Sequence, residues 1–192
     1  MANHKKTIAV IQGDITQIAA DAIVNSAHES LLPGAGVSGA IHARAGSVVE
    51  QECRALYEQH GKQKAGTALP TQAGALDAQY IIHAVGPRWQ GGHANEEELL
   101  ARTYKNIIAT AGQLHLRTVS IPAISVGIFA FPLERAAEIT IHTLVQALQA
   151  SKQAHNVLLV CFSPDITQAY EHALEQAQGN ESIDLVSLAP SF

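Results

Sequence analysis

Glycines and other small residues concentrate in one stretch of this 192-residue sequence, LLPGAGVSGAIH at residues 31–42. Gly34, Gly36 and Gly39 lie close together there, and the stretch contains no Asp, Glu, Lys or Arg. Glycine lets backbone N–H groups turn toward a ligand, and a helix N-terminus adds partial positive charge. Because the stretch follows an expected strand and opens an expected helix, it predicts an anion-binding loop. A flexible connection is the alternative interpretation.

A second stretch with similar chemistry is PAISVGIFAFP, at residues 122–132. Ser125, Gly127 and the backbone of Ile128 and Phe129 offer donors for another anionic group. Two such loops at neighbouring strand ends predict a diphosphate held between them. The sequence has neither a Walker pattern nor G-x-G-x-x-G after its first strand, which disfavours nucleotide hydrolysis of the P-loop kind and a dinucleotide-binding Rossmann fold.

Asp14 and Phe162 end the first and last expected strands and suggest a site for a base. An ionised carboxylate only accepts hydrogen bonds, so Asp14 suits an exocyclic amine such as that of adenine. Its alternative role is to cap its own turn through Thr16. Phe162 offers a face for stacking, although a lone phenylalanine at this position also suits the core.

Other reactive residues carry weaker signals. The stretch AISVG (123–127) differs at one residue from a G-x-S-x-G nucleophile elbow. Such an elbow requires a helix directly after its serine, and Pro132 delays the helix here, which disfavours a serine hydrolase.

The histidines, including His42, lack metal-ligand spacing such as H-E-x-x-H, so no metal site is predicted. Cys53 and Cys161 form no Cys-x-x-Cys pair and imply no disulfide, which suits a reducing compartment.

Short apolar runs alternate with amphipathic helical patterns along the chain. Strands are expected at 7–12, 21–25, 80–85, 118–123 and 156–162, and helical stripes within 100–111, 141–148 and 166–174. Ser163 is expected to cap the last helix, and Ser38 to cap a helix running from Gly39 toward Gly46. The alternation predicts an α/β fold, a three-layer α/β/α sandwich with a mixed, mostly parallel sheet. Ligands of such sheets bind beyond the carboxyl ends of the strands.

Composition limits the classes of partner. Lys and Arg number 12 against 17 Asp and Glu, a formal charge of −5, which disfavours a nucleic-acid partner. No apolar stretch is long enough to span a membrane or form a signal peptide, so we expect no membrane partner and a cytoplasmic location. We expect one domain at residues 1–178 and a C-terminal tail at 179–192, which is either loose or tucked against the body.

Taken together, these stretches resemble the macrodomain family, in its MacroD-type (Appr-1″-p processing) branch. The resemblance covers residues 7–178 and rests on ordered motifs: GDIT (13–16), IVNSA (23–27), LLPGAGVSGAIH (31–42), GTALPTQAG (66–74), IIHAVGPRW (81–89) and SIPAISVGIFAFP (120–132). It implies the macrodomain fold and a pocket for ADP-ribose. The implied partners are ADP-ribose or ADP-ribosylated proteins, and no cofactor is implied.

The resemblance also assigns roles to individual residues. Asp14 would hold the adenine amine, the backbone of Ile15 would hold the adenine ring, and Phe162 would pack on it. The residues expected beside the diphosphate and distal ribose are Gly36, Val37, Ser38, Gly39 and Ala40 on one side and Ser125, Val126, Gly127, Ile128 and Phe129 on the other. Asn25, the first asparagine of the motif, completes the expected ligand-binding set.

Two positions depart from the family pattern. Hydrolytic members usually carry asparagine where this chain has His28 and aspartate where it has Ser38, and those residues orient the distal ribose and the attacking water. His28 and Ser38 are therefore the candidate catalytic positions, without the usual carboxylate. We hypothesise a module that binds ADP-ribose or ADP-ribosylated protein and has weak or absent hydrolytic activity. The alternative is an ADP-ribosyl hydrolase, acting on mono-ADP-ribosylated protein or O-acetyl-ADP-ribose, that uses His28 or a bound water.

Overall fold

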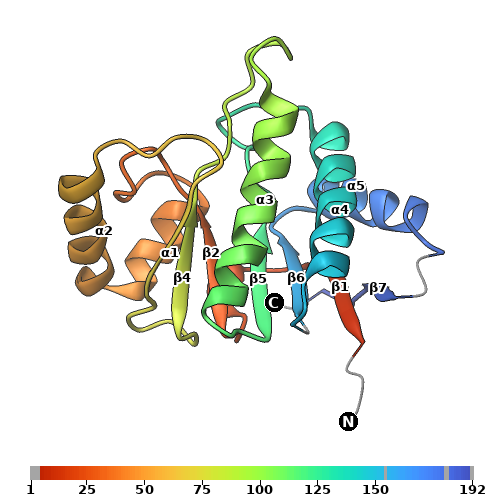
Figure 1. Ribbon diagram of the computed structural model, residues 1–192, viewed down its shortest axis with the longest axis horizontal. Coiled ribbons are helices and arrows are strands. Elements are labelled where there is room, and N and C mark those ends of the chain that lie inside the picture. Colours follow the sequence, from red (N-terminus) through yellow and green to blue (C-terminus); the bar gives the residue numbers. More distant parts are fainter. Residues whose placement is uncertain (1–4, 154, 180–181, 191–192) are drawn as a thin grey trace.

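A computed structural model describes residues 5–153, 155–179 and 182–190. A seven-stranded sheet forms the centre of the molecule, and helices pack on both of its faces (Figure 1). The strands are β1 (Lys6–Gln12), β2 (Ala22–Ser26), β3 (Ala68–Gln72), β4 (Tyr80–Ala84), β5 (Thr118–Pro122), β6 (Asn156–Cys161) and β7 (Ile183–Ser187). The helices are the short 3-10 helix η1 (Ile15–Gln17), α1 (Val37–Ala45), α2 (Ser47–His60), α3 (Glu96–Gln113), α4 (Leu133–Ala150) and α5 (Pro164–Gln176). The predicted α/β/α sandwich is confirmed.

The sheet is mixed and mostly parallel, as predicted. Its strand order is β3-β4-β2-β5-β6-β1-β7, in which β3 runs antiparallel to β4 and the other neighbours are parallel. The carboxyl ends of β1, β2, β5 and β6 therefore open at one edge of the sheet. The loops that follow these strands meet at that edge, where open α/β sheets bind their ligands.

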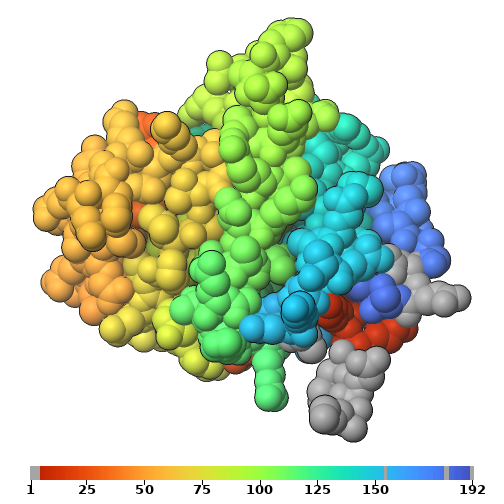
Figure 2. Space-filling model, viewed as in Figure 1, coloured from red at the N-terminus to blue at the C-terminus, as the bar shows by residue number. Residues whose placement is uncertain are grey.

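The segment between β4 and α3, residues 85–95, projects beyond the rest of the body and is called the β4–α3 segment below (Figure 2). Its far end is held by Glu96, whose carboxylate accepts backbone N–H groups of Gln90, Gly92 and Ala94 at 2.9, 3.0 and 2.6 Å. Desolvation raises the pKa of Glu96, but the backbone hydrogen bonds outweigh it and lower the pKa to about 2. The carboxylate therefore stays charged and anchors the segment.

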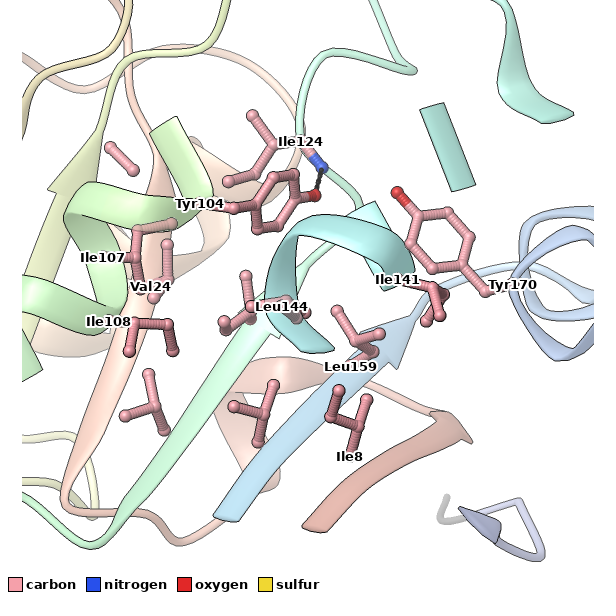
Figure 3. Packing of buried hydrophobic residues seen from close by; sticks show 14 of the residues in the cluster. Ile8, Val24, Tyr104, Ile107, Ile108, Ile124, Ile141, Leu144, Leu159 and Tyr170 are labelled. Carbon is pink, nitrogen blue, oxygen red and sulfur yellow. Dashed lines mark hydrogen bonds between the residues drawn. The ribbon is translucent and has the colours of Figure 1, made fainter. Parts of the chain in front are cut away.

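Two apolar cores lie on the two faces of the sheet. Helices α1 and α2 cover one core, and α3, α4 and α5 cover the other. Successive strand residues point to opposite faces, so Ile82 of β4 joins the core under α3 and α4 while Ile81 joins the core under α1 and α2. Both isoleucines are completely buried. Figure 3 shows the larger core, in which side chains from the strands pack against those of α3, α4 and α5.

Two strands lie outside the predicted set. β3 contains Pro70, which has no N–H to donate, and is tolerated because β3 is an edge strand that pairs only with β4. β7 lies within the predicted tail and pairs in parallel with β1, with Ile183 only 2% exposed. The chain over Ile183–Ser187 is therefore tucked against the body. The division into a domain at 1–178 and a tail at 179–192 stays a prediction.

The expected helix start at Ser38 is wrong. α1 begins at Val37, and its N-cap is Gly36, whose φ of 64° and ψ of −138° turn the chain into the helix. Ser38 lies inside the first turn with its hydroxyl buried. Ser163 does occupy the N-cap of α5, although its hydroxyl contacts the Asp165 carboxylate and caps no backbone N–H. Within the described residues, no helix combines the length and apolar character needed to cross a bilayer.

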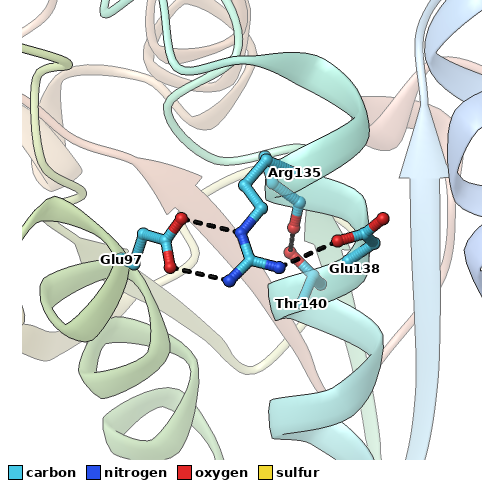
Figure 4. Close-up of polar contacts among 5 residues, drawn as sticks. Glu97, Arg135, Glu138 and Thr140 are labelled. Atoms are coloured by element: carbon cyan, nitrogen blue, oxygen red, sulfur yellow. Dashed lines mark hydrogen bonds and ion pairs between the residues drawn. The ribbon is translucent and has the colours of Figure 1, made fainter. Parts of the chain in front are cut away.

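The starts of α3 and α4 are joined by an ion-pair network (Figure 4). Arg135 donates from Nε and Nη2 to the two carboxylate oxygens of Glu97, both at 2.7 Å, and from Nη1 to Glu138 at 2.9 Å. The paired hydrogen bonds from Arg135 lower the pKa of Glu97. Because these side chains are about half exposed, we expect a modest contribution to stability. The network fixes the start of α4, where the loop after β5 ends.

Tyr104 of α3 connects the larger core to the same loop. Its ring is completely buried, and its hydroxyl oxygen accepts the backbone N–H of Ile124 at 3.3 Å (Figure 3). Ile124 directly precedes Ser125, so this bond holds the backbone where the chain leaves β5. Burial raises the pKa of the Tyr104 hydroxyl, which therefore stays protonated.

We expect Tyr104→Phe to destabilise the protein by about 1–3 kcal/mol, because it leaves the buried Ile124 N–H without its acceptor. Urea unfolding of the wild type and the variant measures the difference. Tyr57→Phe, at a partly exposed position on α2, is the control and should change the free energy of unfolding by less than about 0.5 kcal/mol. Equal stability of Tyr104→Phe and wild type would show that the bond is dispensable.

Candidate functional site

Two clefts adjoin one another at the carboxyl edge of the sheet. The first, called the proximal cleft, has a volume of about 410 Å³ and is lined by Gly13, Asp14, Ile15, Gly36, Val37, Ala40, Pro122, Ala123, Val126, Gly127, Val160, Phe162 and Ile166. The second, called the distal cleft, has a volume of about 280 Å³ and is lined by Ser26, Ala27, His28, Ser30, Leu32, Pro33, Gly34, Ala35, Gly36, Val37, Ser38, Ala123, Ser125, Gly127, Ile128 and Phe129. Gly36, Val37, Ala123 and Gly127 line both clefts, so the two form one extended groove.

One wall of the groove is the glycine-rich loop and the first turn of α1. Gly36 needs its positive φ to start the helix, and no side chain caps that end. The N–H groups of the first helical turn have no acceptor within the helix, which leaves them for a ligand or water. Gly39 is required for a different reason, because a Cβ there would lie 2.5 Å from the carbonyl oxygen of Gly34. Its missing side chain lets the loop pack directly on the helix.

The opposite wall is the loop from Ala123 to Phe129. Ser125 holds a φ of 69° without being glycine, a conformation that L-residues adopt at an energetic cost. The β4–α3 segment packs closely behind it, since a Cβ on Gly86 would lie 2.3 Å from Ser125 Oγ. Gly127 is different, because a Cβ there would meet nothing within 4 Å. Its open side belongs to the groove.

Two hydroxyls are left unpartnered in the distal cleft. The Oγ atoms of Ser38 and Ser125 are buried and have no hydrogen-bond partner among the described residues, and both residues line the cleft. Buried polar atoms of proteins are nearly always paired, so these two hydroxyls are exceptions, and Ser125 Oγ lies against the backbone of Gly86. Neither hydroxyl hydrogen-bonds to a base in the described part of the chain. For Ser125 this agrees with the interpretation that it is no hydrolase nucleophile, as does the start of α4 at Leu133.

The proximal cleft combines a carboxylate with apolar walls. Asp14 Oδ1 accepts the N–H of Thr16 at 2.9 Å and its hydroxyl at 2.8 Å, so the turn-capping role considered for Asp14 is present in the structure. No bond to Oδ2 is found within the described chain, so that oxygen can accept a ligand donor as well. Phe162 is 78% exposed, which excludes it from the core and presents its ring at the cleft.

His28 lies at the rim of the distal cleft and is exposed. Its Nδ1 accepts the backbone N–H of Ser30 at 3.3 Å and lies 3.0 Å from the Ser30 hydroxyl. An accepting Nδ1 carries no proton, so the neutral ring carries its proton on Nε2. The remaining nitrogen of His28 is therefore a donor in this arrangement.

The structure brings most of the predicted site residues together. Those that line one or both clefts are Asp14, Ile15, His28, Gly36, Val37, Ser38, Ala40, Ser125, Val126, Gly127, Ile128, Phe129 and Phe162. Asn25 and Gly39 line neither cleft, because Asn25 faces the core under α1 and α2 and Gly39 packs against Gly34. Sequence analysis did not single out Ser26, Ser30, Pro33, Ala123, Val160 or Ile166. The available signals were the positions of Ser26, Pro33 and Ala123 inside the quoted motifs and that of Ile166 at the start of α5.

A buried polar cluster lies behind the distal cleft. Asn25 Nδ2 donates to Nδ1 of His83 at 3.1 Å, so His83 carries its proton on Nε2 and donates it to Thr71 Oγ1 at 2.9 Å. The Thr71 hydroxyl in turn donates to the carbonyl of Gln72 at 3.0 Å. Cys53 Sγ of α2 lies 3.5 Å from His83 Nε2. The cluster connects strands β2, β3 and β4 with α2.

His42, Cys53 and His83 also form a group with metal-ligand chemistry, their ligand atoms lying within 4.8 Å of one another. Spacing in the sequence could not predict this group, because its members come from α1, α2 and β4. Burial raises the pKa of the Cys53 thiol to about 12, and burial followed by the charge of His42 lowers the pKa of His83 to about 3. Both nitrogens of His83 already bond side chains. We therefore interpret the group as a neutral part of the core, in which Cys53 and His83 are hydrogen-bonded and the buried His42 ring has no hydrogen-bond partner among the described residues.

Comparison with known proteins identifies the family. The Macro domain family pattern matches residues 24–140. O-acetyl-ADP-ribose deacetylase 1 of Pantoea vagans is 45% identical over 86% of this chain and 96% of its own length. Among solved structures, the Oceanobacillus iheyensis macrodomain with ADP is 35% identical, covers 87% of this chain and 89% of its own, and superposes with a TM-score of 0.83. The Trypanosoma brucei macrodomain in complex with ADP-ribose is 29% identical, with coverages of 87% and 68% and a TM-score of 0.79.

The chain therefore belongs to the macrodomain family, as the motifs predicted. The residues that match the family pattern include both loops that form the groove.

Acid should destabilise this protein through His83. Its pKa rises from about 3 in the folded chain to the ordinary 6.5 on unfolding, so the unfolded chain binds the extra proton between these values. Above pH 6.5 His83 is neutral in both the folded and the unfolded chain, and its contribution to the free energy of unfolding is complete. As the pH falls below 6.5, protonation of the unfolded chain lowers the free energy of unfolding by up to about 1.4 kcal/mol per pH unit. We expect His83→Gln to be less stable at pH 7 but to lose stability less steeply as the medium is acidified from neutrality, measured by urea unfolding. An unchanged pH slope would contradict this assignment.

Proposed function

We propose that this macrodomain binds ADP-ribose, either free or attached to protein. The observation that carries the proposal is the division of one groove into two chemically different halves. The proximal half has a carboxylate and the exposed Phe162 ring, which suit an adenine amine and its ring face. The distal half is lined by the polar residues Ser26, His28, Ser30, Ser38 and Ser125, a lining that suits a ribose.

The shared middle of the groove supports a diphosphate there. Gly36 and Val37 form the uncapped start of α1, whose free N–H groups and positive dipole end favour an anion. Gly127 faces them across the groove without a side chain. The Trypanosoma brucei relative is described in complex with ADP-ribose and the Oceanobacillus iheyensis relative with ADP, which supports the same ligand class for this chain.

We further propose that this chain binds its ligand without efficient hydrolysis. None of the described residues that line the distal cleft is an aspartate or glutamate. The Ser38 hydroxyl hydrogen-bonds to no base among the described residues, and a neutral hydroxyl alone does not deprotonate a water. His28 presents its protonated nitrogen, since Nδ1 already accepts from Ser30. Replacement of the usual asparagine and aspartate by His28 and Ser38 stays an inference from the resemblance.

Hydrolysis is the second candidate function, and a specific observation favours it. The Pantoea vagans relative is named an O-acetyl-ADP-ribose deacetylase. In this chain His28 lies at the distal cleft, and a change of tautomer would turn its Nε2 into a base. The reaction would then be attack of a water on the acetyl ester or on the protein linkage at the distal ribose.

Partners and location follow from the same proposal. The partners would be ADP-ribose and ADP-ribosylated proteins, and the acidic net charge of −5 disfavours nucleic acid. Both cysteines are free and buried, which fits a cytoplasmic location.

ADP-ribose should bind more tightly than AMP, because AMP lacks the second phosphate and the second sugar. Gly127→Val should weaken ADP-ribose binding by about tenfold or more, equivalent to at least about 1.4 kcal/mol, by filling the middle of the groove. The fold should tolerate this change, since a Cβ at Gly127 meets no atom within 4 Å. Isothermal titration calorimetry measures affinity, and an unchanged melting temperature is the control. Equal affinity of the wild type for AMP and ADP-ribose would overturn the proposal.

The wild type should release ADP-ribose from O-acetyl-ADP-ribose or from modified glutamate slowly or not at all. His28→Asn combined with Ser38→Asp should raise this rate by about 10²–10⁴-fold, because it restores a positioned acid–base group. ADP-ribose affinity of the double variant, measured in parallel, should stay close to that of the wild type and so reports an intact groove. Efficient wild-type turnover that disappears in His28→Ala would instead establish the hydrolase function with His28 as base. Efficient turnover that survives His28→Ala would contradict both assignments.

A further inference from the structure

The outer end of the distal cleft is supported from behind by the β4–α3 segment. Trp89 donates its backbone N–H to the carbonyl of Phe129 at 2.9 Å. Arg88 donates from Nη1 to the carbonyl of Ile128 at 3.3 Å, and its guanidinium carbon lies 4.8 Å from the centre of the Phe129 ring. One short piece of chain thus contacts both the backbone and the aromatic ring at the tip of the opposite loop.

The tip of that loop has few other supports. Ile128 is 74% exposed, and Ala130 holds a positive φ of 54°. Within the loop, Ala130 N–H bonds to the carbonyl of Gly127 at 2.9 Å and Phe131 N–H to that of Ser125 at 3.0 Å. These bonds close the turn but do not determine where the Phe129 side chain points. Its position depends on what packs against its ring.

Arg88 is suited to hold that ring. A planar guanidinium stacks on an aromatic face, and Arg88 forms no ion pair with any described acidic residue that would draw it away. The segment that carries Arg88 is itself fixed. Glu96 binds its backbone at three N–H groups, and the Trp89 ring packs on Phe131 at 4.7 Å between centroids. Arg88 therefore approaches Phe129 from a rigid support.

We propose that Arg88 is a positioning residue that fixes Phe129 at the wall of the distal cleft and so sets the preference for ligands with a second sugar. It acts through Phe129 and does not need to touch the ligand. The proposal rests on ADP-ribose binding as the proposed function. Substitution of Arg88 should not change the affinity for ligands that fill only the proximal cleft, where Asp14 and Phe162 lie.

The test compares Arg88→Ala with wild type by calorimetry with ADP-ribose and with AMP. We expect the dissociation constant for ADP-ribose to rise about two- to fivefold, the loss expected for one exposed cation–π contact, and that for AMP to stay unchanged. Arg88→Lys keeps the charge and should recover part of the loss. Arg54→Ala is the matched control, because Arg54 is an exposed arginine on α2 that pairs with Glu50 at 3.0 Å.

A double-mutant cycle tests whether Arg88 acts through Phe129. In a Phe129→Leu background, Arg88→Ala should have little further effect on ADP-ribose affinity. Full additivity of the two changes, or an equal loss of AMP and ADP-ribose affinity in Arg88→Ala, would overturn the proposal.

Hydrogen exchange in the ligand-free protein separates this proposal from the proposed function. Amides of residues 123–131 should exchange faster in Arg88→Ala than in wild type or Arg54→Ala, because the loop tip loses its support. If the wild type binds no ADP-ribose, the proposed function fails while faster exchange still supports the contact between Arg88 and Phe129. Unchanged exchange would refute that contact in either case.

Discussion

The close approach of two backbone segments at the start of α1 is the constraint on which the groove depends. The carbonyl of Gly34 passes so near to residue 39 that any side chain there would collide with it. Because residue 39 is glycine, the loop folds back against the helix and leaves the first-turn N–H groups at the groove. The same packing turns Ser38 inward, where its hydroxyl is buried in the distal cleft.

The opposite wall is arranged by different means. Its backbone is held by groups behind it: Tyr104 accepts the N–H of Ile124, and Gly86 leaves space for Ser125. Arg88 and Trp89 reach the far end of the same loop. The wall at the start of α1 is positioned by close backbone packing, which the missing glycine side chains allow. The wall from Ala123 to Phe129 is positioned by contacts from α3 and the β4–α3 segment. Between them, the only described acidic side chain that lines the groove is Asp14.

The position of the charged and polar groups in the groove determines which steps it can carry out, ligand recognition or hydrolysis. A groove with free N–H donors, two unpaired hydroxyls and one carboxylate can recognise a dinucleotide-like ligand at both ends. Hydrolysis requires in addition a group that accepts a proton from water at the distal sugar. Ser38 and His28 line the distal cleft, where Ser38 Oγ has no hydrogen-bond partner among the described residues and His28 Nδ1 accepts the Ser30 N–H. Under the proposed function, these two side chains are where binding would separate from catalysis.

Sequence alone determined the fold class, the family and most of the groove. Apolar runs predict strands that are buried on both faces of a sheet, and the glycine-rich stretches come directly after two of these runs. The loops were therefore expected at the carboxyl ends of parallel strands. Most of the predicted site residues line the clefts, from Asp14 after β1 to Phe162 after β6, since their positions follow from the strands that they succeed, while their ligand-binding roles stay predictions.

Only the tertiary structure decided what depends on contacts between distant segments. Asn25, expected at the ligand, lines neither cleft: its amide nitrogen bonds His83, while its amide oxygen has no hydrogen-bond partner among the described residues. β3 and β7 are the edge strands of the sheet, and their own sequences did not predict strands. They are strands because they pair with β4 and β1. The group of His42, Cys53 and His83 combines residues of three elements, and the contacts of Arg88 and Trp89 with Phe129 join two segments that are far apart in the chain. No local pattern encodes such groups, because side-chain proximity across elements is set by packing and register and not by spacing along the sequence.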